Sequence, residues 1–228
     1  GTLFPYTTLF RSIGLGAAMA VLALAGYALV VSPAIASRHA AETAAMHRQS
    51  WLLMCRDPAA GDEPAALRRR LWEVVRVDLV RRARTDPGEP ELWRELAALY
   101  ELFWRETGRD AMRRDAIGAL EREATLRPVH YQPHHRQALI YAMAAQEEPD
   151  PARRKLFLAS ALDAYRKSIA RYPTLPALHL EYARILRRAG KEEAAREAYR
   201  RALELDEQIT QTIRHLTEQE RKEAGLWR

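Results

Sequence analysis

The chain has 228 residues, of which 48% are hydrophobic and 29% charged, enough for one compact or elongated domain. Ala, Leu, Arg and Glu dominate and Pro and Gly are few, which predicts an all-α protein. The formal charge is +6, but no recognised nucleic-acid motif accompanies the basic residues, so we assign this charge to solvated helix faces and disfavour a nucleic-acid partner. The single cysteine, Cys55, excludes an internal disulfide.

Residues 2–12 read TLFPYTTLFRS, a string that resembles the translation of a sequencing-adapter oligonucleotide. We therefore interpret residues 1–12 as an artefactual segment and exclude them from fold reasoning. On this interpretation the natural start is missing, and the chain is the tail of a longer protein.

Residues 13–33 are predicted to form a transmembrane helix. No charged residue occurs among them, and about 20 apolar residues match the thickness of a bilayer core. The alternative is a cleaved secretory signal, because Ala34, Ile35 and Ala36 have the small-x-small pattern of a cleavage site. We favour the membrane helix because the apolar run is longer than a usual signal core. The expected location is a bacterial inner membrane, with the side of the remaining chain unassigned.

Residues 37–86 are predicted to form a divergent first helical pair. Residues 37–54 are alanine-rich and amphipathic, and residues 57–64 contain the turn formers of a loop. Residues 65–84 are predicted to be helical again, with an apolar stripe. The stripe consists of Leu67, Leu71, Val74, Val75, Leu79 and Val80.

Residues 175–208 contain two helical runs separated by Gly190. Large residues occur at Tyr182, Leu186 and Tyr199, and small residues at Ala183, Ala195 and Ala202. Small residues allow two helices to approach closely, and large ones fill the space beside them. This spacing resembles the tetratricopeptide repeat, a helix–turn–helix unit of 34 residues. His179 and Glu207 depart from the family pattern. The resemblance implies a helical-hairpin solenoid over residues 87–208 that binds other proteins.

Three prolines set the register of the repeats, because a proline ends the second helix in this family. Pro87, Pro128 and Pro173 are separated by intervals longer than 34 residues. We assign the excess to insertions at the turns inside the first two repeats, as longer helices or extended turns. Gln137 and Glu123 depart from the expected residue types.

The remaining elements are a turn and a cap. Gly190 is predicted to adopt a left-handed conformation at the end of a helix. Residues 209–228 are predicted to form a capping element with a helix over residues 209–223, which shields the last apolar face of the solenoid.

No pattern in the sequence indicates an enzyme. A glycine-rich phosphate loop and a nucleophile elbow are both missing. His130, His134 and His135 are the one cluster of candidate metal ligands, but no cysteine or H-E-x-x-H pattern completes the set, so we predict no metal and no cofactor. His134 occupies an aromatic repeat position, which favours core packing.

The family resemblance also implies a partner-binding groove on the first helix of each repeat. Solvated helix faces are the alternative interpretation of the same positions. The groove residues are Arg94, Glu95, Ala98, Glu101, His135, Arg136, Leu139, Met143, Leu180, Glu181, Arg184, Arg187 and Arg188. The last three suit an acidic peptide or an anionic glycan.

We therefore predict a membrane-anchored helical-repeat scaffold for protein–protein interaction. The hydrophobic helix followed by repeats ending in LTEQERKE also resembles the carboxy-terminal region of bacterial O-antigen-ligase-like polysaccharide polymerases. That resemblance implies that the catalytic membrane part lies upstream of this chain. The third alternative is a secreted or periplasmic repeat protein with a cleaved signal.

Overall fold

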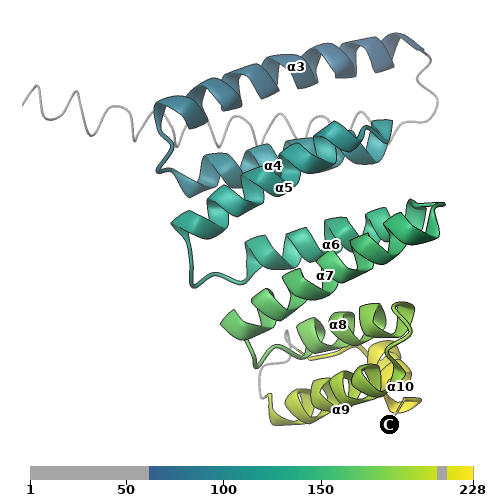
Figure 1. Cartoon of the computed structure of the whole chain (residues 1–228). Coiled ribbons are helices and arrows are strands. Elements are labelled where there is room, and N and C mark those ends of the chain that lie inside the picture. Colours follow the sequence, from purple (N-terminus) through teal and green to yellow (C-terminus); the bar gives the residue numbers. More distant parts are fainter. Residues whose placement is uncertain (1–61, 210–214, 228) are drawn as a thin grey trace, which may run out of the picture. The chain divides into compact units, whose positions relative to one another are not determined.

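The computed structural model describes residues 62–209 and 215–227, and every regular element within these ranges is an α-helix (Figure 1). The all-α prediction is confirmed for this part of the chain. The helices are α3 (Asp62–Thr85), α4 (Pro90–Thr107), α5 (Asp110–Leu126), α6 (Gln132–Glu147), α7 (Pro151–Arg171), α8 (Pro176–Arg188), α9 (Glu192–Gln208) and α10 (Glu218–Gly225).

The expectations for residues 1–12, 13–33 and 37–54 lie outside the described residues. Within the described ranges, no helix combines the length and the apolar character needed to cross a bilayer.

The chain divides into two compact units, Gly1–Glu95 and Leu96–Arg228. In the first unit, α3 buries Trp72, Val75, Leu79 and Ala83. Two expectations for this helix are wrong. It begins at Asp62 inside the predicted loop, because acidic residues and a proline suit the first turn of a helix. Val74 is also 65% exposed, so it lies off the buried stripe.

The second unit consists of consecutive helical hairpins. Within hairpins, α6 packs on α7 and α8 packs on α9. Between hairpins, α5 packs on α6 and α7 packs on α8, and α10 then packs on α9. This nearest-neighbour order is that of a solenoid, in which each unit contacts only the units next to it. The insertions predicted at the turns are longer helices, because only two or three residues separate α4 from α5 and α6 from α7.

The predicted small positions of the last hairpin are at its helix crossings. Ala183 on α8 and Ala195 and Ala202 on α9 are fully buried, as is Tyr199 beside them. The preceding hairpin repeats the arrangement on α7 with Ala161, Tyr165 and Ser168, all of them buried. The close approach of paired helices therefore rests on alanine and serine, as the sequence pattern predicted.

Gly190 closes α8 in the predicted left-handed conformation, with φ of 72°. The Gly190 N–H donates to the Arg187 carbonyl, and the Lys191 N–H donates to the Leu186 carbonyl, both at 2.9 Å. These two bonds form a Schellman motif, which satisfies the last carbonyls of the helix. Gly108 ends α4 with a similar φ of 66°, and sequence reasoning did not single it out.

Replacing Gly190 with Val is expected to lower the free energy of unfolding by about 1 kcal/mol or more. The cost is conformational, since a Cβ at this position meets no atom within 4 Å. Thermal unfolding monitored by circular dichroism measures the effect. Gly190→Asn is the control variant and should lose less stability than Gly190→Val, because Asn tolerates a left-handed backbone. An unchanged melting temperature for Gly190→Val would contradict the prediction.

Replacing Ala195 with Leu is expected to destabilise the protein by about 1–3 kcal/mol. Ala195 is 0% exposed at the α8–α9 crossing, so three further carbons would separate the helices. Urea denaturation measures the loss. Ala194→Leu is the matched control, because Ala194 is the exposed neighbour on the same helix. Equal stability of the two variants would show that the crossing is loosely packed.

The C-terminal element differs from the predicted helix over residues 209–223. Ile209, Leu216 and Thr217 are not helical, and the helix begins at Glu218. The reason is a capping box, in which the Thr217 hydroxyl accepts from the Glu220 N–H while the Glu220 carboxylate accepts from the Thr217 N–H. Thr217 therefore starts a new helix. Leu216 and Ala224 are buried in the core of the second unit, where α10 packs on α9, and the capping role of this segment stays a prediction.

Candidate interaction surface

The predicted groove residues lie on α4, α6 and α8, the first helices of successive hairpins. Arg94 and Glu95 belong to the first unit. There Arg94 is exposed and pairs with Glu91, whereas Glu95 is buried and only 8% exposed. The other predicted residues belong to the second unit. We call the accessible ones among these residues the first-helix surface. They are Ala98 and Glu101 on α4, His135, Arg136, Leu139 and Met143 on α6, and Glu181, Arg184, Arg187 and Arg188 on α8.

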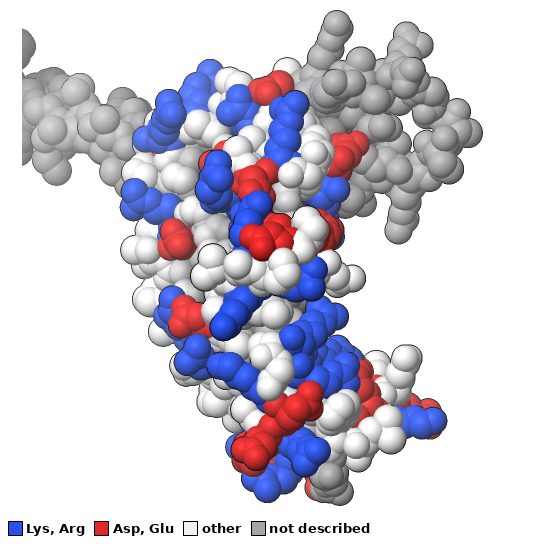
Figure 2. All heavy atoms as spheres, turned by 45° about the vertical axis from the view of Figure 1, so that its right-hand side comes forward, with Lys and Arg blue, Asp and Glu red and all other residues white. Residues whose placement is uncertain are grey.

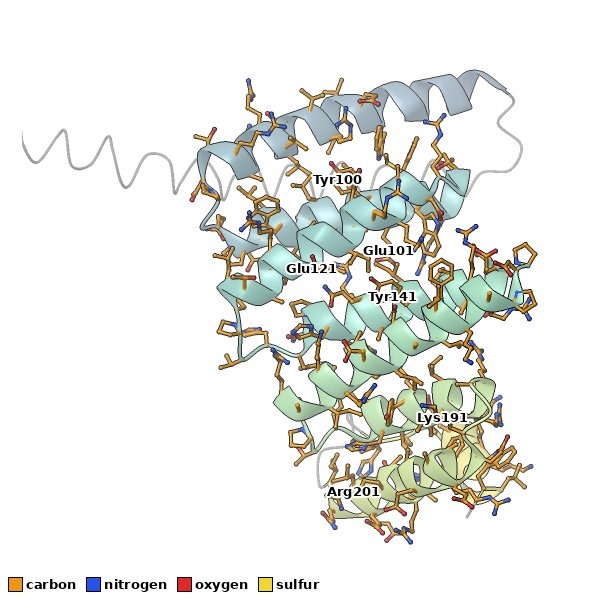
Figure 3. The ribbon with its side chains drawn as sticks, viewed as in Figure 1. Tyr100, Glu101, Glu121, Tyr141, Lys191 and Arg201 are labelled. Atoms are coloured by element: carbon orange, nitrogen blue, oxygen red, sulfur yellow. The ribbon has the colours of Figure 1, made fainter. Side chains whose placement is uncertain are left out.

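Glu101 makes the first contact between hairpins on this surface. Its carboxylate accepts from the guanidinium of Arg136 on α6 at 2.9 Å and from Arg105 on its own helix at 2.8 Å. Figure 3 labels Glu101 beside α6. Met143 on α6 is half-buried, and its sulfur lies 3.2 Å from the Arg105 guanidinium. Ala98 and Leu139 are also half-buried.

His135 makes the second contact, from α6 to α8. Its Nε2 lies 2.5 Å from a carboxylate oxygen of Glu181, which also accepts from the Tyr165 hydroxyl at 3.2 Å. Because a carboxylate only accepts, the proton of this bond is carried by the histidine nitrogen. Burial, and then the negative charge of Glu181, raise the pKa of Tyr165 well above its ordinary value, so its hydroxyl remains a neutral donor.

Arg184 on α8 makes the third contact, with the C-terminal segment. Its guanidinium donates to both carboxylate oxygens of Glu223, the shortest bond being 2.6 Å, and lies 4.0 Å from Glu220. The hydrogen bond from Arg184 lowers the pKa of Glu223, and burial opposes that shift. The guanidinium of Arg187 lies over the Trp227 ring, 5.0 Å from its centroid. The C-terminal segment is therefore an intramolecular partner of α8.

Burial and internal contacts correct three parts of the predicted groove, the first being the burial of Glu95. Leu180 is 0% exposed and lies in the hydrophobic core with Ala183 and Leu186, so it cannot contact a partner. Arg184 and Arg187 contact Glu223 and Trp227 instead of presenting free charge to an acidic ligand. Of the three arginines, Arg188 is exposed and has no ion pair within the described chain.

His134 is buried in the second unit, in line with its repeat position. Its Nδ1 lies 3.3 Å from the Gln137 side-chain oxygen, and burial lowers its pKa. In the part of the chain that the structure describes, no group of three or more His, Cys, Asp or Glu is placed to hold a metal ion.

A cleft that sequence reasoning missed lies between α7 and the turn that joins α8 to α9. Its volume is about 370 Å³, and a second recess of about 440 Å³ shares Arg154, Leu158 and Arg188 with it. We call the two together the basic cleft. Its cations are Arg154, Lys155, Arg166, Arg188 and Lys191, with Leu158, Ala159, Leu162 and Ala189 among the apolar lining. The signal in the sequence was the run of cations at residues 153–155.

Two hairpins of the second unit repeat each other position by position. Ala161, Tyr165 and Ser168 on α7 correspond to Ala195, Tyr199 and Ala202 on α9 at the 34-residue spacing of the family, and all six are buried. The fold is tetratricopeptide-like.

Solved structures of several other proteins are similar to this chain. One is a crystal structure of the MamA protein, with a TM-score of 0.49 and 19% identity over 64% of this chain and 70% of that chain. Another is TTC0263, a thermophilic TPR protein of Thermus thermophilus, with a TM-score of 0.44 and 19% identity over 64% and 71%. A third is the human IFIT1 dimer with PPP-AAAA, with a TM-score of 0.43 and 17% identity over 62% and 34%.

No family model and no curated protein matches the chain. The resemblance to O-antigen-ligase-like polymerases and the adapter interpretation of residues 1–12 therefore remain predictions.

Proposed function

We propose that the tetratricopeptide-like repeats form a scaffold that binds a segment of another protein along the first-helix surface. The supporting observation is the continuity of that surface from one hairpin to the next. Glu101 contacts Arg136, and His135 contacts Glu181, so successive first helices present their polar side chains side by side. An extended segment could follow such a surface and exchange hydrogen bonds with several helices.

The half-buried residues of α6 give this surface its apolar contacts. Leu139 and Met143 are partly accessible beside the paired charges, and a partner side chain could cover them. Interfaces gain affinity from apolar centres and use paired polar groups at the rim for specificity. The local charges are already paired, so we expect a partner segment of mixed composition on α4 and α6.

Site-specific photocrosslinking tests this proposal in the host cell. A benzophenone side chain replaces Met143 on the first-helix surface, and in a second variant it replaces Ala170, an exposed residue of α7. We expect a defined protein adduct from position 143 and none from position 170. Circular dichroism verifies that both variants are folded. Adducts at position 170 alone, or at neither position, would reject the proposal.

We also propose that residues 13–33 anchor the scaffold in a membrane. The support is the uncharged sequence of these residues, whose length matches a bilayer core. Alkaline carbonate extraction of the full chain should leave it in the membrane pellet, and deletion of residues 13–33 should release it. A full chain found in the supernatant, or shortened after Ala36, would contradict the anchor.

A further inference from the structure

The basic cleft gathers five cationic side chains, none of which forms an ion pair with a carboxylate of the described residues, although Asp163 acts on Arg166 at longer range. Arg154 donates to the backbone carbonyls of Glu148 and Pro149, and Arg166 donates to that of Leu162. Lys155, Arg188 and Lys191 form no ion pair with any carboxylate of the described chain. Like charges that share a concave, partly apolar surface repel one another and attract anions. A bound anionic ligand would relieve this repulsion.

Two acidic residues at the start of α7, Glu148 and Asp150, are engaged in local contacts. Asp150 caps α7 by accepting from the N–H groups of Ala152 and Arg153. Glu148 accepts from the Asp150 N–H and pairs with the Arg153 guanidinium at 3.2 Å. These two carboxylates therefore form no ion pair with the cations that line the cleft.

The insertion in the second hairpin contributes to the lining of the cleft. Relative to α9, the additional residues extend the start of α7 back to Pro151, and this extension carries Arg154 and Lys155. On the opposite wall, the left-handed Gly190 turn places Arg188 and Lys191 at the end of α8. Figure 3 labels Lys191 at this turn. Figure 2 shows Lys and Arg side chains on the face that it draws, with Asp and Glu side chains among them.

The lining argues for a peptide over a small inorganic anion. Leu158 and Leu162 line the cleft, and Ala159 is exposed between them in the sequence. These apolar side chains form no hydrogen bond or ion pair with a phosphate. The two recesses, about 370 and 440 Å³, share Arg154, Leu158 and Arg188, so the cleft is longer than one anion needs. Apolar side chains and carboxylates on one ligand would match both kinds of lining.

We propose that the basic cleft binds an acidic segment of a partner protein. Its carboxylates contact Lys155, Arg188 and Lys191, and a large apolar side chain of the same segment packs on Ala159 and Leu158. The site differs from the first-helix surface, so it can be tested separately from the scaffold proposal.

Selection from a random peptide library, displayed on phage and applied to the full chain, tests the proposal. We expect the selected peptides to combine Asp or Glu with Leu, Phe or Trp. A synthetic copy of a selected peptide is then titrated by fluorescence anisotropy. The triple variant Lys155→Glu, Arg188→Glu, Lys191→Glu should bind it about tenfold more weakly or worse, because like charges would then face each other.

Two further variants control this result. Arg114→Glu, Arg122→Glu, Arg196→Glu makes the same change of net charge on exposed arginines outside the cleft, and it should retain the affinity. Ala159→Trp fills the cleft from an exposed position and should abolish binding without unfolding the protein.

Several outcomes would overturn the inference. The inference is wrong if the selected peptides are basic or uncharged, or if no peptide is selected. It is also wrong if the cleft variant and the control triple variant lose peptide affinity equally. An oligoadenylate RNA that binds more tightly than the peptide, and is lost in the cleft variant alone, would assign the cleft to nucleic acid instead. Loss of the crosslink at Met143 would leave this result unaffected, so the two proposals fail independently.

Discussion

Replacing Tyr199 with Ala is expected to lower the free energy of unfolding by about 3–5 kcal/mol. Tyr199 is 0% exposed in the core of the last hairpin. Its ring stacks on Trp227, with centroids 6.2 Å apart, and its hydroxyl lies 3.3 Å from a carboxylate oxygen of Glu223. The change therefore leaves a cavity and removes the surface on which the C-terminal segment packs. Urea denaturation followed by circular dichroism measures the loss.

Tyr199→Phe separates the ring from its hydroxyl. Burial raises the pKa of Tyr199, so the hydroxyl is a neutral donor to Glu223, and removing it should cost about 1 kcal/mol. The ring and its stack on Trp227 remain. Equal losses for the Phe and Ala variants would show that the hydrogen bond, and not the packing, dominates at this position.

The fold of the last two hairpins was predictable because its pattern is local in sequence. Two helices joined by a short turn pack through residues that lie within one 34-residue unit. The 34-residue repeat in the sequence therefore indicates which side chains contact each other between the two helices. Ala183, Ala195 and Tyr199 are fully buried at the positions this rule gives. The insertions were located by the same rule, since they lengthen a unit without changing its crossings.

Two of the departures from the family pattern, His179 and Gln137, have structural reasons. His179 donates from Nε2 to the Pro173 carbonyl at 2.8 Å, as Trp93 donates to the Pro87 carbonyl at 3.0 Å. The histidine therefore keeps the hydrogen bond of the aromatic residue it replaces. Gln137 departs from the expected residue type, and its side chain contacts His134, which occupies an aromatic repeat position, inside the core. A single sequence read against a consensus does not reveal such a contact.

The candidate sites were less predictable, because they depend on contacts between distant segments. Arg184 and Glu223 are far apart in sequence, and no repeat rule places the chain after the last hairpin. The signal for α10 was nevertheless present, since Thr217 and Glu220 have the spacing of a capping box. The basic cleft likewise joins Arg154 to Arg188, which lie on different hairpins.

Asp206 is expected to fix the C-terminal segment, and Asp206→Ala should destabilise the protein by about 3 kcal/mol or more. The carboxylate is 4% exposed and accepts from the Leu216 N–H and the Arg221 guanidinium, both at 2.6 Å, and from His215 at 3.1 Å. Without it the buried Leu216 N–H loses its acceptor. The hydrogen-exchange rate of the Leu216 amide is the direct measurement. The Asp206→Asn variant keeps an oxygen acceptor, so its Leu216 amide should retain part of its protection from exchange.

The same carboxylate makes the attachment of the segment sensitive to acid. Burial acts to raise the pKa of Asp206, but the bonds from Leu216, Arg221 and His215 outweigh it and hold the pKa below its ordinary value. The pKa of an aspartate in the unfolded chain is about 3.9. Because the pKa of Asp206 is lower in the folded protein, the ionised carboxylate stabilises the fold at pH values above the unfolded-state pKa. This stabilisation is lost as the pH falls through the folded-state pKa. Protection of the Leu216 amide should therefore decrease below about pH 4 in the wild type. The Asp206→Asn variant does not titrate at this position, so its Leu216 amide should lose less protection from hydrogen exchange over that pH range. Equal losses in the wild type and the variant would assign the acid response to other groups. Glu223 is one such group, because the hydrogen bond from Arg184 also lowers its pKa.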